Sequence, residues 1–211
     1  YDELSNVSKN IKIVVTTYFE HSNEATKILV NTPIWALGLD FIHGVKNLES
    51  LEFIKNSNKV LIAGVIDGRN IWKSNFEDKL NLLNKISNVV SKDNIIVGTS
   101  CSLLHVPFTL SYEDNLDKEI KSWLAFANEK LKELNLVSKQ FFGSKLSLED
   151  IANIEKNRQD NIQRKVSTKI HNQKIQEEIK NLKKFEREDK FEDRIKAQRE
   201  FFKYDFLTTT T

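Results

Sequence analysis

Four short runs of β-branched and other apolar residues limit most strongly what this chain can fold into. They read "IKIVVTTYF" (11–19), "LDFIHG" (39–44), "KVLIAGVI" (59–66) and "NIIVGTSCS" (94–102). The runs are nearly continuous in apolar character rather than alternating with polar residues, which is typical of strands covered on both faces of a parallel sheet. The sequence therefore predicts four buried, parallel strands.

Segments with helical spacing separate these runs and cover residues 23–31, 47–56 and 75–90. In the last of them, Phe76, Leu80, Leu83 and Ile86 fall on one side of a helix. Parallel strands need such crossovers, and repeated βα units predict an α/β sheet or barrel.

The rest of the chain has the pattern of helices. Residues 115–141 are predicted to form one long helix that ends at Gly143. The residues on its predicted buried stripe are Leu116, Ile120, Trp123, Leu124, Ala127 and Leu131. From 148 to 203 the chain is rich in charged residues at helical spacing, which predicts two or three exposed helices.

Charge and composition exclude several classes of protein. The 32 Lys and Arg residues nearly balance the 30 Asp and Glu residues, so no overall field favours nucleic acid or a membrane as a partner. The basic run 156–176 lacks interleaved aromatic residues for base stacking, which favours a solvated helix face. The one cysteine cannot form an internal disulfide, so we expect a reducing, cytoplasmic location.

A polar turn follows the third predicted strand. Asp67, Arg69 and Asn70 stand in the stretch "GVIDGRNIW", at the carboxyl end of a strand, where barrel proteins commonly bind ligands. The alternative is that Asp67 and Arg69 pair with each other or cap the next helix, since turns are made of such residues in any case.

The only cysteine, Cys101, is followed four positions later by His105. Both could lie on one face if the fourth strand extends that far. Zinc needs three or four protein ligands, and a nucleophilic cysteine needs a histidine that a third group orients. The pair offers neither pattern, so a structural role for Cys101 is favoured, because free cysteine is among the most buried residue types.

Taken together, several stretches resemble the amino-terminal half of the cobalamin-independent methionine synthase family. They are "KIVVTTYF", "GLDFIHG", "AGVIDGRNIW", "SCSLLHVPFTL", "LDKEIKSWLAFANEKLKEL", "VSTKIHN" and the terminal "TTT". The resemblance implies that residues 1–147 form the second half of a non-catalytic (β/α)8 barrel. Residues 148–205 would be its charged helical extension, and 206–211 the start of a linker. Leu207 stands where the family pattern has a proline.

The resemblance also implies an activity for the parent protein, of which this chain would be a fragment. The family transfers a methyl group from 5-methyltetrahydropteroyltriglutamate to homocysteine, using a zinc ion held in a carboxyl-terminal catalytic barrel. That barrel would be the partner of this chain. No catalytic residue or metal ligand is expected here, and the isolated chain is expected to be inactive. The candidates for the folate side are Asp67, Arg69, Asn70 and His105.

A different class of function remains open from the sequence. The chain could be a stand-alone, non-catalytic interaction module that binds a polyanion or a protein through its charged helices between 148 and 203. Four strands cannot close a barrel of eight, so we also expect the isolated chain to aggregate or to dimerise through its open sheet edges.

Overall fold

The computed structural model describes residues 2–7, 10–182 and 189–203. The chain divides into two compact units, Tyr1–Val166 and Ser167–Thr211. The α-helices and strands of the first unit are α1 (Asp2–Val7), β1 (Val14–Thr16), α2 (Asn23–Leu29), β2 (Ala36–Asp40), α3 (Leu51–Lys55), β3 (Val60–Ile66), α4 (Phe76–Ser87), β4 (Ile95–Thr99), α5 (Lys118–Ser122), α6 (Ala127–Phe142) and α7 (Leu148–Val166). The second unit contains α8 (Gln173–Asn181) and α9 (Phe191–Phe202).

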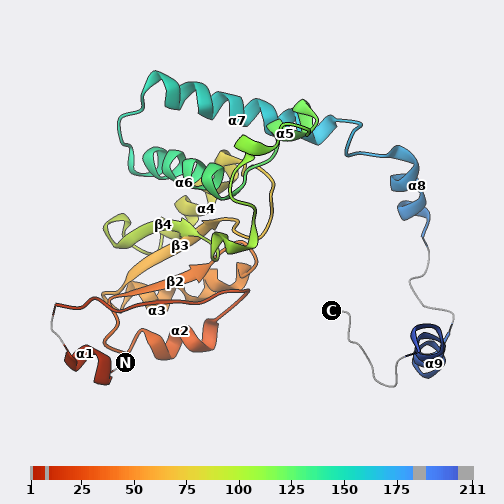
Figure 1. The fold of residues 1–211 in the computed structure, drawn as a ribbon. Coiled ribbons are helices and arrows are strands. Elements are labelled where there is room, and N and C mark those ends of the chain that lie inside the picture. Colours follow the sequence, from red (N-terminus) through yellow and green to blue (C-terminus); the bar gives the residue numbers. More distant parts are fainter. Residues whose placement is uncertain (1, 8–9, 183–188, 204–211) are drawn as a thin grey trace. The chain divides into compact units, whose positions relative to one another are not determined.

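The four strands form one parallel sheet with the order β1-β2-β3-β4 (Figure 1). This confirms the predicted parallel α/β fold. Strands that lie side by side in the order of the chain, each joined to the next by a helix, are the arrangement of consecutive βα units in a (β/α)8 barrel. The sheet is consistent with half of such a barrel.

The strand ends differ from those predicted. β1 is only three residues long, and β2 begins at Ala36 and ends at Asp40 instead of covering 39–44. The second strand ends there because one carboxylate oxygen of Asp40 accepts the backbone N–H groups of Ile42 and His43, which turns the chain. β4 ends at Thr99, before the cysteine.

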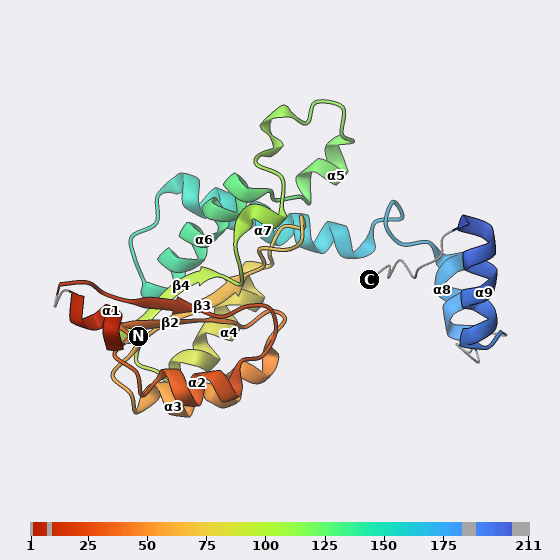
Figure 2. The same ribbon diagram turned by 60° about the horizontal axis from the view of Figure 1, so that its bottom comes forward.

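One face of the sheet is covered by helices. Leu37, Leu39, Leu61, Ala63 and Val97 pack in one apolar core with side chains from α2, α3, α4 and α6. Figure 2 shows α2, α3 and α4 together below the strands. The predicted apolar side of the third helix is confirmed, since the core includes Phe76, Leu83 and Ile86, with Leu80 partly buried against it.

The opposite face of the sheet is more open. Val14 of β1 and Ile96 of β4 are 43% and 41% exposed, although both lie in strands. In a closed barrel this face would be the interior, which side chains fill in layers. Self-association of the isolated chain stays a prediction.

The prediction of one helix over 115–141 is wrong. α5 ends at Ser122 and α6 begins at Ala127, because residues 123–125 bond instead to residues 71–73. The N–H of Lys73 donates to the carbonyl oxygen of Trp123 at 2.8 Å, and the N–H of Ala125 donates to that of Ile71 at 2.8 Å.

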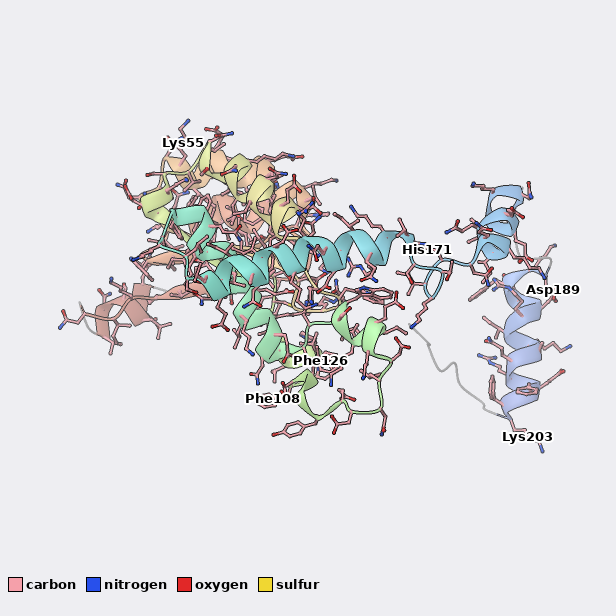
Figure 3. The ribbon with its side chains drawn as sticks, turned by 90° about the horizontal axis from the view of Figure 1, so that it is seen from above. Lys55, Phe108, Phe126, His171, Asp189 and Lys203 are labelled. Atoms are coloured by element: carbon pink, nitrogen blue, oxygen red, sulfur yellow. The ribbon has the colours of Figure 1, made fainter. Side chains whose placement is uncertain are left out.

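Helix α6 begins beside the backbone of Phe108 and ends at Gly143. Figure 3 labels Phe126 and Phe108 in this region, where the N–H of Asn128 donates to the carbonyl oxygen of Phe108 at 3.0 Å. Leu131, predicted to be buried, is 51% exposed. The predicted stop at Gly143 is confirmed, since this glycine ends the helix in the left-handed conformation with φ 67°.

The charged segment forms three helices in the part of the chain that is described, namely α7, α8 and α9. α8 and α9 have no buried residues, as expected, but α7 belongs to the first unit and buries three polar side chains. The division at 147/148 inferred from the family stays a prediction, and residues 206–211 lie outside the described residues.

Candidate functional site

Polar and aromatic side chains gather where the four strands end. We call this side of the sheet, formed by the carboxyl ends of the strands, its carboxyl edge. Parallel strands end on the same edge, so the turns that follow them are neighbours. The residues concerned are Tyr18 and Phe19 after β1, Asp40 at the end of β2 and His43 after it, Asp67, Arg69 and Asn70 after β3, and Cys101 and His105 after β4.

The buried carboxylate of Asp67 organises the turn after β3. It accepts the backbone N–H of Arg69 at 2.8 Å and the side-chain amide of Asn70. The Nε2 atom of His43 lies 3.5 Å from the same carboxylate. Asp67 therefore binds the backbone N–H of Arg69. The residue that caps the next helix, α4, is not Asp67 but Asn75, whose side chain accepts the N–H of Glu77.

The side chain of Arg69 turns toward the loop after β1. Its guanidinium carbon lies 4.5 Å from the centre of the Phe19 ring, which is the geometry of a cation–π contact. The ring of Phe19 also contacts His105, with ring centres 5.3 Å apart and planes at 67°. The structure thus brings two of the predicted residues, Arg69 and His105, onto one phenylalanine.

Sequence reasoning missed Phe19, Asp40 and His43. Asp40 is fully buried, and its second carboxylate oxygen has no hydrogen-bond partner among the described residues. A signal was present, because an aspartate ends a run of apolar residues at "GLDF" just as it does at "VIDG". This signal can be used only if β2 is known to end at Asp40.

Cys101 and His105 have different neighbours. Cys101 is buried, and its Sγ atom lies 3.6 Å from the carbonyl oxygen of Ser102. A Cβ atom added to Gly68 would lie 2.9 Å from that sulfur, so the turn after β3 packs tightly on it. Burial raises the pKa of the Cys101 thiol. This geometry favours the structural role that the sequence predicts for the cysteine.

Because β4 ends at Thr99, the face that would have carried both side chains does not continue to His105, which lies in a 3-10 turn over Leu103–His105. Within the described ranges, no three His, Cys, Asp or Glu side chains gather into a group that could hold a metal ion.

A cavity of about 410 Å³ lies on the open face of the sheet, next to this edge. Its lining has no charged side chain and consists of Thr16, Thr17, Tyr18, Gly38, Leu39, Ile62, Gly98, Thr99, Ser100, Cys101, Ser102, Leu103, Leu131 and Leu134. None of the four predicted site residues lines it. The charged side chains therefore lie outside the cavity, although both are found at the carboxyl ends of the strands.

Parallel strands in chain order, helices on one face and polar turns at the carboxyl ends are consistent with half of a protein of the α/β-barrel class. Residues 1–91 match the family model described as the N-terminal domain of cobalamin-independent synthase. Over these residues the chain is similar to that domain.

The whole chain also aligns with curated relatives named 5-methyltetrahydropteroyltriglutamate–homocysteine methyltransferase. It is 46% identical to the protein from Desulforamulus reducens, 38% to that from Listeria monocytogenes and 37% to that from Catharanthus roseus. The chain covers 27% of the first relative and 28% of the other two. It therefore spans about a quarter of their length. None of the described helices is long and apolar enough to cross a membrane.

Proposed function

We propose that this chain is a non-catalytic part of a methyltransferase that moves a methyl group from 5-methyltetrahydropteroyltriglutamate to homocysteine. The names of the relatives, which match along the whole chain, support this proposal. A carboxyl-terminal catalytic barrel is the proposed partner, zinc its proposed metal and the cytoplasm its proposed location. The described residues here do not fit a zinc site, so no chemical step is assigned to them.

The role proposed for this chain is to support the folate at the carboxyl edge of its sheet. The proposal rests on the contacts that the guanidinium of Arg69 makes. Among the described residues, no hydrogen bond or ion pair engages its guanidinium, which only stacks on Phe19. A guanidinium held in place by a ring keeps its N–H groups for an anion, and arginine binds carboxylates in a two-bond geometry. The substrate named for the relatives carries glutamate carboxylates.

The test is made in a full-length methyltransferase that carries this chain. Arg69→Ala should raise KM for the methyl-folate about tenfold or more, because a charge-assisted hydrogen bond contributes roughly 1.5–3 kcal/mol. The value of kcat should stay nearly constant, since the residue would bind the substrate equally in the ground and transition states.

The matched control is Arg158→Ala, which removes an exposed arginine that is already paired with Glu155. It should leave both constants unchanged. If Arg69→Ala also leaves KM for the methyl-folate unchanged, the folate role of this edge is rejected.

A further inference from the structure

Helix α7 buries a polar face. Asn157, Asp160 and Asn161 are each at most 6% exposed, and Arg164 continues the same stripe. Their spacing of three and four residues places them on one side of the helix, where a packed helix normally carries apolar residues. Buried polar side chains need hydrogen-bonding partners, so the surface beneath α7 must supply them.

The partners are backbone groups of the segment that joins β3 to α4. The side-chain amide of Asn157 donates to the carbonyl oxygen of Ser74 at 2.8 Å, and its oxygen accepts the N–H of Phe76 at 3.3 Å. Asn161 donates to the same carbonyl oxygen of Ser74 at 3.2 Å. Two asparagines thus bind the backbone on both sides of Asn75.

The two charged residues of the stripe hold the preceding part of this segment. Asp160 accepts a hydrogen bond from the Lys73 ammonium at 2.6 Å. Arg164 donates to the carbonyl oxygen of Lys73 at 3.3 Å, and its guanidinium carbon lies 5.4 Å from the centre of the Trp72 ring.

Helix α6 holds the same segment from another direction. The ammonium of Lys130 donates to the carbonyl oxygen of Trp72 at 3.1 Å, and Glu133 accepts the N–H of Ser74 at 3.0 Å. Together with the bonds from residues 123–125, these contacts engage backbone groups from 71 to 76. The segment is fixed by backbone contacts rather than by its own secondary structure.

The held segment continues directly from the turn that carries Arg69. The N–H of Trp72 donates to the side-chain oxygen of Asn70 at 3.0 Å, and the amide of Asn70 donates to Asp67. We propose that Asn157 and Asn161 are positioning residues, which fix the 71–76 segment and through it the turn Asp67–Asn70. The consequence for substrate binding rests on the proposed function of Arg69, but the positioning itself does not.

The positioning is tested by amide hydrogen exchange in a full-length methyltransferase that carries this chain, without substrate. Asn157→Leu keeps the branched shape of the side chain but removes its bonds to Ser74 and Phe76, and also the one that it accepts from Asn161. Exchange at Ser74 and Phe76 and within residues 67–73 should become about tenfold faster, because hydrogen bonds that close the local structure are lost. Exchange in β4 should stay as it is. Gln159→Leu, at an exposed position of the same helix, is the control and should change neither region.

Two results would overturn the proposal. One is unchanged exchange over 67–76 in Asn157→Leu, and the other is an equal increase in β4, which would mean general destabilisation. If Asn157→Leu does not fold, Asn161→Ala decides the question, because it leaves the bonds of Asn157 to Ser74 and Phe76 in place. It should produce a smaller increase confined to 67–76, and no increase there would reject the proposal.

A second measurement separates positioning from folate binding. In the full-length methyltransferase, Asn157→Leu should raise KM for the methyl-folate in the same direction as Arg69→Ala, with kcat nearly unchanged. If exchange over 67–76 rises but neither variant changes KM, the positioning stands and the proposed folate role fails. If Arg69→Ala raises KM but exchange is unchanged, the folate role stands and the positioning fails.

Discussion

The guanidinium of Arg69 lies on the ring of Phe19, 4.5 Å from its centre, and so joins the turn after β3 to the loop after β1. β1 and β3 are not neighbours in the sheet, since β2 lies between them. The contact therefore spans the edge at which the candidate residues gather. It also gives Arg69 a fixed place without using its N–H groups.

This contact should be measurable as a coupling energy. In a double-mutant cycle with Phe19→Leu and Arg69→Met, we expect about 0.5–1 kcal/mol in the free energy of unfolding, as for an exposed cation–π pair. Urea unfolding of the four chains gives the value. Phe19→Leu combined with Arg158→Met is the control and should be additive. Additivity in the Arg69 cycle as well would show that the contact has no energetic weight.

The open face of the sheet should not tolerate a side chain at Gly38. A Cβ atom there would lie 2.8 Å from Cγ2 of Thr16 on the adjacent strand, which is closer than carbon atoms pack. Gly38→Ala should lower the free energy of unfolding by about 1–3 kcal/mol, the usual cost of overpacking. In a Thr16→Ala background most of this loss should be recovered, because Cγ2 is removed. An equal loss in both backgrounds would place the strain elsewhere.

The thiol of Cys101 should react slowly in the folded chain. The residue is buried, and burial also raises its pKa, so less thiolate is present at pH 7. Titration with an aromatic disulfide should be roughly tenfold or more slower without urea than in urea. In Gly68→Ala the new Cβ would lie 2.8 Å from the carbonyl oxygen of Cys101. The turn after β3 would have to move away from the cysteine, so the thiol of the folded chain should react faster. Equal rates with and without urea would contradict the buried position.

The stability of the chain should fall with rising pH through the ionisation of Glu133. Burial raises the pKa of Glu133 above its ordinary value of 4.5, although attraction by Lys130 and hydrogen bonds from Ser74 oppose the shift. The folded state thus holds this proton more tightly than the unfolded state does. Its contribution to stability is complete below pH 4.5 and is lost as the pH rises through the higher folded pKa.

Glu133→Gln should remove that part of the pH dependence, because the amide oxygen can still accept the N–H of Ser74 but cannot ionise. Urea unfolding from pH 4 upward should show a flatter profile for this variant than for the unmodified chain. Glu149→Gln, at an exposed position of α7, is the matched control. A profile for Glu133→Gln that is parallel to that of the unmodified chain would contradict the assignment.

The parallel fold could be predicted because it depends on patterns that are local in the sequence. Continuous apolar runs separated by helical spacing have few solutions other than strands buried on both faces and joined by crossover helices. The apolar side of α4 and the end of α6 at Gly143 follow from the same local rules. The polar turn at Asp67 was recognised because it follows a strand whose limits the pattern defines well.

Only the tertiary structure decided the features that depend on distant partners. The helix over 115–141 is interrupted because residues 123–125 bond to a segment about fifty positions earlier in the chain. The stripe of α7 has the composition of a solvated surface, yet it is buried because backbone groups of 73–76 satisfy it.

The composition of the site was decided in the same way. Phe19, Asp40 and His43 join Asp67 and Arg69 only through the order and register of the strands. A sequence specifies which segments become strands by their own apolar pattern. Which turn residues meet at the edge depends on where each strand ends, and at Asp40 that end is set by hydrogen bonds from the carboxylate to the backbone of Ile42 and His43.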